Sequence, residues 1–136
     1  SWLKPKGKLF VHIFCHQKFA YFFSTEGSDN WMGRYFFTGG LMPSEDLLSK
    51  FQKNLSLDKQ WRWNGRHYKQ TSNAWLKNMD REKFNILPIL EEVYGRKERD
   101  TWFQRWRIFF MACAELFAYK SGNQWFVAHY LFNKKS

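Results

Sequence analysis

The feature that most constrains the fold is a turn followed by an apolar run early in the sequence. Pro5 and Gly7 stand within Leu3-Lys4-Pro5-Lys6-Gly7-Lys8-Leu9, and residues 8–14 are mostly apolar. Proline stops a helix because it lacks an N–H, and glycine permits turn conformations that other residues avoid. The pattern predicts a helix exit, a tight turn and a strand over 8–14 that is covered on both faces. We therefore expect an α/β fold, with residues 1–136 as the C-terminal part of a larger domain.

The rest of the sequence alternates between helical and strand patterns. Ser44, followed by two acidic residues, predicts the N-cap of a helix over 44–53, and Thr71 or Ser72 predicts the N-cap of another over 72–81. The other expected elements are strands over 55–63 and 124–132 and helices over 84–94 and 98–119. Strands and helices in this order fit the end of an α/β sheet.

The composition limits the classes of function. Aromatic residues make up 21% of the chain, with 15 Phe and 8 Trp, which indicates a crowded core together with an apolar pocket. The net charge of +10 favours anionic partners, although the basic residues are scattered and also suit a solvated surface. Two cysteines in apolar settings suit a reducing compartment, so we expect a cytoplasmic protein. We expect no metal site, and no nucleic-acid partner because the aromatic residues follow core-like spacings.

A few residues could carry chemistry. His12 falls at the carboxyl end of the first predicted strand, where α/β folds bind ligands, but a buried structural histidine is an equal alternative. His16 is expected in a loop, and Tyr68 offers a phenol beside a predicted turn over 64–68. Trp102, Trp106 and Phe109 share one helical stripe, which is either core or the wall of a pocket for a cationic or planar ligand.

Together these motifs resemble a known family. The Pro5–Gly7 turn resembles the one before the fifth strand of class I S-adenosylmethionine-dependent methyltransferases. The segments that narrow the resemblance are His12-Ile13-Phe14, Tyr35-Phe36-Phe37-Thr38-Gly39-Gly40, Met42-Pro43-Ser44, Asn64-Gly65-Arg66-His67-Tyr68, Trp106-Arg107-Ile108-Phe109-Phe110, Ala114-Glu115-Leu116-Phe117 and Val127-Ala128-His129-Tyr130-Leu131-Phe132. They are similar to the C-terminal half of the cyclopropane fatty acid synthase superfamily, in its coclaurine N-methyltransferase-like branch.

The resemblance implies a fold, a cofactor and roles for particular residues. The fold would be the C-terminal part of a class I, Rossmann-like methyltransferase sheet with added helices. S-adenosyl-L-methionine would be the methyl donor, bound mostly upstream, so residues 1–136 would form the substrate-side part of one domain and be inactive alone. In the lipid-cyclopropanating branch, residues matching His12 and Tyr68 hold a bicarbonate that acts as base, and Phe14 replaces a family Ile.

The resemblance also implies substrate contacts and leaves the substrate open. In the N-methyltransferase branch Trp106 and Phe109 match residues of the amine pocket, and Phe14, Phe36 and Phe37 are further candidates for substrate binding. The leading prediction is N-methylation of a small, aromatic amine. The alternatives are a cyclopropane fatty-acyl-phospholipid synthase, with peripheral contact to an anionic membrane, and a non-catalytic basic module that binds lipid. The oligomeric state is left open.

Overall fold

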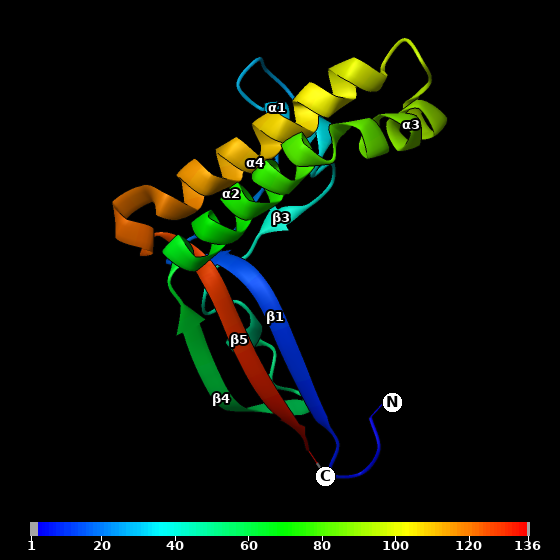
Figure 1. Cartoon of the computed structure of the whole chain (residues 1–136). Helices are drawn as coiled ribbons and strands as arrows, with labels where there is room; N and C mark the ends of the chain where they lie inside the picture. The colour runs from blue at the N-terminus through cyan, green and yellow to red at the C-terminus, as the bar shows by residue number, and fades with distance from the viewer. Residues whose placement is uncertain (1–2, 136) are drawn as a thin grey trace.

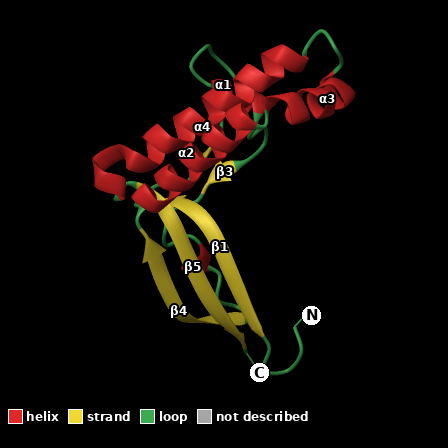
Figure 2. Ribbon diagram, viewed as in Figure 1, coloured by secondary structure: helices red, strands yellow, loops and turns green. Residues whose placement is uncertain are grey.

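The computed structural model describes residues 3–135. Its strands and helices separate into two parts, with the helices gathered at one end of a sheet (Figures 1 and 2). In chain order the elements are β1 (Lys8–His16), β2 (Tyr21–Phe22), α1 (Trp31–Tyr35), β3 (Leu41–Met42), the 3₁₀ helix η1 (Leu48–Lys50), β4 (Leu55–Trp63), α2 (Gly65–Arg81), α3 (Lys83–Tyr94), α4 (Arg99–Gly122) and β5 (Trp125–Lys134).

The main sheet has three strands in the order β1-β5-β4. Strand β5 is antiparallel to both neighbours, so β1 and β4 run parallel to each other and both end next to the helices. Side chains of β5 alternate between a buried face and a more open face, as the pleat of a strand requires. The buried face packs with residues around η1 and β4 to form one core, whose fully or nearly buried members are Cys15, Phe126, Ala128, Tyr130 and Phe132.

The strand predicted over 8–14 is present as β1, but its surroundings differ from the prediction. Among the described residues β1 is an edge strand whose one strand neighbour is β5, apart from an isolated bridge between His16 and Ser44. Leu9 and Phe10 are 37% and 54% exposed, and only Cys15 and His16 at its end are buried. Within residues 3–135 the expectation of a strand covered on both faces is therefore wrong, because no helix packs over its first half.

The helices over 84–94 and 98–119 are confirmed as α3 and α4, whereas the helix predicted from residue 72 begins at Gly65. Asn64 is its N-cap: the Asn64 side chain accepts a hydrogen bond from the backbone N–H of Arg66 at 2.9 Å. Gly65 is needed there because a Cβ would lie 2.2 Å from the backbone oxygen of Phe117. The segment 64–68, predicted as a turn, is thus the cap and first turn of α2.

The prediction of a helix over 44–53 is wrong, since only the short η1 forms in that segment. Ser44 does not cap a helix; its hydroxyl donates to a carboxylate oxygen of Asp46 at 2.7 Å. The backbone is instead held extended against the end of β1, where the N–H of His16 donates to the carbonyl of Pro43 at 2.9 Å. Pairing with β1 therefore outweighs the local capping signal.

Candidate active site

A small enclosed cavity lies where the end of the sheet meets the helices. Its volume is about 70 Å³, and its walls come from β1, β2, α1, the loops on either side of α1, β3, α2 and α4. Three residues selected from the sequence line it: Phe14, Phe37 and Tyr68. This is the carboxyl end of β1, the position at which α/β sheets commonly bind ligands. The cavity is small, and it places the Tyr68 side chain beside the aromatic residues Phe14 and Phe37.

Tyr68 is one of the residues with a polar group that line this cavity, together with Tyr21 and Cys113. It lies in the first part of α2, and its ring packs edge-on against Phe117 with 4.4 Å between centroids. Burial, with a smaller contribution from Cys113, raises the pKa of the Tyr68 phenol above its ordinary value of 10.0. The phenol therefore stays protonated at neutral pH and can donate a hydrogen bond, as a group that holds an oxygen acceptor must.

The structure joins the predicted substrate-binding residues in one series of ring contacts. Phe36, just after α1, stacks on Phe109 of α4 with 4.4 Å between centroids and meets Trp106 edge-on at 4.9 Å. Phe37 contacts Phe109 at 5.7 Å and Phe14 at 6.0 Å. The series therefore runs from the end of β1 to the middle of α4. The role of these five residues in binding substrate stays a prediction.

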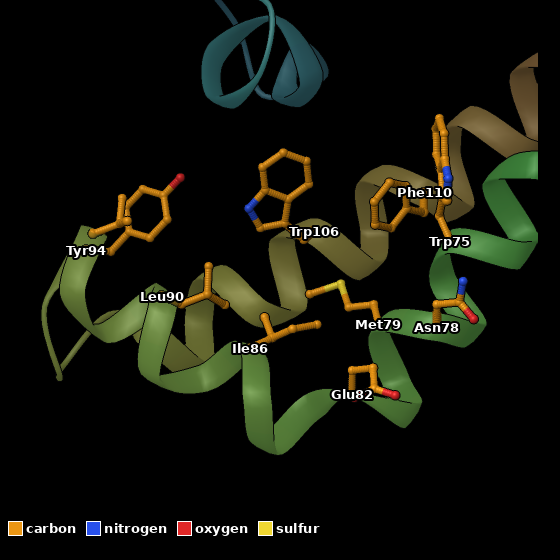
Figure 3. Close-up of a pocket in the computed structure, with 10 residues that line it drawn as sticks. Trp75, Asn78, Met79, Glu82, Ile86, Leu90, Tyr94, Trp106 and Phe110 are labelled. Carbon is orange, nitrogen blue, oxygen red and sulfur yellow. The ribbon is translucent and has the colours of Figure 1, made fainter.

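A second and much larger hollow opens on the other side of Trp106, between α2, α3 and α4 (Figure 3). Its volume of about 780 Å³ lies within the range of small-molecule sites. The walls are mostly apolar and aromatic, and in Figure 3 Trp106 stands between the groove and α1. The lining residues are Trp75, Asn78, Met79, Glu82, Ile86, Leu90, Val93, Tyr94, Trp106 and Phe110.

Sequence reasoning identified only Trp106 in this groove. The residues it missed include Tyr94 of α3 and Phe110 of α4, together with Met79 and Leu90, which are nearly buried beneath them. The helical periodicity of α2, α3 and α4 marks each of these residues as facing a neighbour. It does not reveal that α3 turns back along α4 and leaves a hollow between the two helices.

His12 does not lie where the sequence indicated. Strand β1 continues to His16, so His12 is in the middle of the strand, and its predicted place at the carboxyl end is wrong. Its Nδ1 lies 2.7 Å from Nε2 of His129, the residue paired with it on β5. His12 is not among the residues that line the Tyr68 cavity. The structure therefore does not bring the two predicted catalytic residues into one cavity, and their catalytic roles stay predictions.

His16 is the histidine at the strand end, and it is buried rather than in a loop. Its Nδ1 accepts hydrogen bonds from the backbone N–H groups of Lys18 and Phe19 at 3.0 and 2.9 Å. Burial, followed by the nearby charge of Lys120, lowers the pKa of His16 below its ordinary value of 6.5. A neutral imidazole that caps the turn after β1 explains this environment, which makes His16 structural.

The two cysteines are free and buried. Burial raises the pKa of Cys15 to about 12 and that of Cys113 to about 11, so neither is a thiolate nucleophile at neutral pH. Within residues 3–135 no three His, Cys, Asp or Glu side chains are grouped as a metal site. None of the helices in the described part combines the length and apolar character of a transmembrane span.

Comparisons with known proteins test the expected fold and the family resemblance. No family model matches the chain. It is 37% identical over 138 aligned positions to (S)-coclaurine N-methyltransferase of Papaver somniferum. The alignment covers 99% of this chain and 39% of that enzyme. A crystal structure of coclaurine N-methyltransferase bound to N-methylheliamine and SAH matches with a TM-score of 0.85 and 32% identity, over 98% of this chain and 40% of that one. A cyclopropane synthase from Mycobacterium tuberculosis matches with a TM-score of 0.70 and 16% identity, over 97% of this chain and 46% of that one.

The chain therefore has the α/β fold of the C-terminal portion of the methyltransferases that include coclaurine N-methyltransferase and the cyclopropane synthases. Within that class, its resemblance to the coclaurine N-methyltransferase-like branch is confirmed along nearly its whole length. The chain spans about two fifths of the length of the curated relatives it matches.

Proposed function

We propose that this chain is the substrate-side part of an S-adenosylmethionine-dependent methyltransferase that N-methylates a small aromatic amine. The observation that carries the proposal is the aromatic groove of about 780 Å³ at Trp106, in a chain 37% identical to a coclaurine N-methyltransferase. The ring series of Phe36, Phe37 and Phe109 adjoins Trp106 on the other side. These residues would form the dry wall that a methyl acceptor needs.

The chemistry of the groove suits an amine that enters in its neutral form. Methyl transfer requires a free nitrogen lone pair, and a net charge of +10 repels a protonated amine. Among residues 3–135 Glu82 is the one ionised side chain that lines the groove, and it is already bonded to Arg81 and Asn85. The product ammonium gains a cation–π contact with the Trp106 ring, so the groove can stabilise the charge that the reaction creates.

The methyl donor supplies an electrophilic methyl group on a sulfonium, and we assign none of the described residues to holding it. We infer that the donor site precedes this segment within the same domain. The contribution of residues 3–135 is then to bind the acceptor, exclude water and set its orientation, effects that lower the barrier to a bimolecular transfer. We further propose a cytoplasmic location, on the ground that two buried free thiols suit a reducing compartment.

A lipid substrate is the second candidate, and one surface favours it. Along α3 the side chains of Phe84, Ile89 and Val93 are 85%, 59% and 64% exposed, next to the rim of the groove. Exposed apolar side chains on a basic protein suit contact with an anionic membrane. Under this candidate a cyclopropane synthase would use bicarbonate as base; of its two predicted ligands Tyr68 lines the small cavity, whereas His12 does not.

Assay of the intact protein with methyl-labelled S-adenosylmethionine distinguishes these candidates. One acceptor is a tetrahydroisoquinoline-type amine, and the other is a vesicle of unsaturated, anionic phospholipid. We expect label on the amine nitrogen, at a rate that vesicles do not change. Label in the acyl chains, with a rate that falls as salt screens the basic surface, would favour the lipid candidate and contradict the proposal. Labelling of neither acceptor, with vesicle binding retained, would leave the non-catalytic basic module.

A further inference from the structure

Three rings form a hydrogen-bonded chain across the open face of the sheet. Trp63 of β4 donates its indole N–H to Nδ1 of His129 on β5 at 2.9 Å. Nε2 of His129 lies 2.7 Å from Nδ1 of His12 on β1. His12 and His129 are register partners, so the backbone of the sheet fixes the spacing of the two imidazoles. These two hydrogen bonds therefore link all three strands of the main sheet.

The indole fixes the direction of every hydrogen bond in this chain. An indole nitrogen can only donate, so Nδ1 of His129 must be the unprotonated, accepting nitrogen. The proton of neutral His129 is then on Nε2 and is donated to Nδ1 of His12. His12 in turn must carry its own proton on its remaining nitrogen, Nε2.

We propose that Trp63, acting through His129, sets the tautomer of His12. The Nδ1 of His12 then accepts from His129, and its protonated Nε2 is the nitrogen that does not contact His129. Trp63 and His129 are positioning residues in this arrangement. An additional proton could enter only at an accepting Nδ1, where it would oppose a donor and break one hydrogen bond. The geometry therefore gives His12 an N–H donor at Nε2, where a free imidazole could offer either a donor or a lone pair.

Packing around His129 makes the network more than a surface contact. The His129 ring is half-buried, with Phe10 edge-on at 5.1 Å and Trp63 at 5.7 Å between centroids. These neighbours restrict the water that would otherwise compete for the His129 nitrogens. The consequence for the reaction rests on the proposed function: His12 would hold an oxygen acceptor through its N–H and would not remove a proton from the amine.

The test is the ¹⁵N NMR signature of the histidine rings in the intact protein at neutral pH. Long-range ¹H–¹⁵N correlations distinguish the two tautomers, and His12→Gln and His129→Gln assign the signals. We expect the Nε2-protonated form at both rings. Trp63→Phe removes the donor and should convert both rings to mixtures of tautomers. The exposed Trp61, which pairs with His129 in register, provides the matched control, and Trp61→Phe should leave both signatures unchanged.

Protonated Nδ1 at either ring of the wild type would overturn the proposal. So would Trp63→Phe with both tautomers still fixed, because another group would then be setting them. Trp63 is 49% exposed, so its replacement by Phe should not prevent folding. The spectra require no turnover, and failure of the methyltransferase assay would therefore not alter their result.

Discussion

The helical end of the molecule and the open face of its sheet both use aromatic rings, but in different ways. At the helical end Phe36, Trp106 and Phe109 contact one another through their faces and edges. On the sheet His12 and His129 contact each other through nitrogen atoms. The first arrangement tolerates many ligands because apolar contact has little directionality, whereas the second specifies where each proton lies. Shape selection and proton placement are thus separated in this fold.

Tyr68 lies where the two regions meet, and its substitution should have the largest effect. It shares a cavity with Phe14, which is on the same face of β1 as His12, and with Phe37, which belongs to the ring series. If its phenol holds an anion or positions the acceptor, Tyr68→Phe should lower kcat about 10²–10⁴-fold in the intact enzyme. Steady-state kinetics and a melting curve test this. An unchanged kcat in a folded variant would give Tyr68 a purely structural role.

Substitution of Trp106 tests the helical end alone. Trp106→Ala should raise the KM for the amine roughly 10- to 100-fold, which corresponds to about 1–3 kcal/mol for the lost aromatic wall and its buried area. The affinity for S-adenosylmethionine should change little. Trp61→Ala, which removes an exposed indole from the sheet, is the matched control and should leave this KM unchanged. If Trp106 is only core, its variant should have a lower melting temperature and a normal KM.

Local sequence patterns predicted those elements whose ends are set locally. The strand predicted over 55–63 has the same bounds in the structure, as β4. Helix α3 ends before Gly95 as expected, because Gly95 adopts a φ of 83° that ends the helix. The start of α2 was missed although Asn64 is a local N-cap signal, and the need for glycine at position 65 could not be predicted because it comes from the distant backbone of Phe117. The segment at Ser44 likewise depends on β1, which the capping pattern cannot reveal.

The candidate site also divides into features that local sequence predicts and features that depend on distant contacts. The spacing of Trp106 and Phe109 along one helix was enough to select residues that the structure brings into contact. The groove itself depends on how α3 packs against α4, and no local pattern encodes that. The bond between His12 and His129 joins residues that are 117 positions apart, so only the pairing of β1 with β5 reveals it. Contacts of this kind require the tertiary structure.

The smallest expected effect is a pH dependence of stability that belongs to the sheet alone. Burial, followed by the neighbouring His12, lowers the pKa of His129 below its ordinary value of 6.5. The unfolded chain therefore takes up a proton at a pH where folded His129 remains neutral. The stability associated with this ring is fully present above pH 6.5 and is lost as the pH falls below that value. The groups that face the network are His12 on β1, Trp63 on β4 and His67 at the start of α2.

Unfolding free energies measured from about pH 5 to 8 should reveal this contribution. His16 also has a lowered pKa, so the wild type should lose stability on acidification for two reasons. His129→Gln removes one of them and should have the shallower pH dependence. His67→Gln, at an exposed histidine that contacts only the Trp63 end of the network, should follow the wild type. Equal slopes for His129→Gln and the wild type would show that folding does not hold His129 neutral. The hydrogen-bonded rings on the sheet would then not fix where the His129 proton lies, and the contrast with the apolar ring contacts of the helical end would be lost.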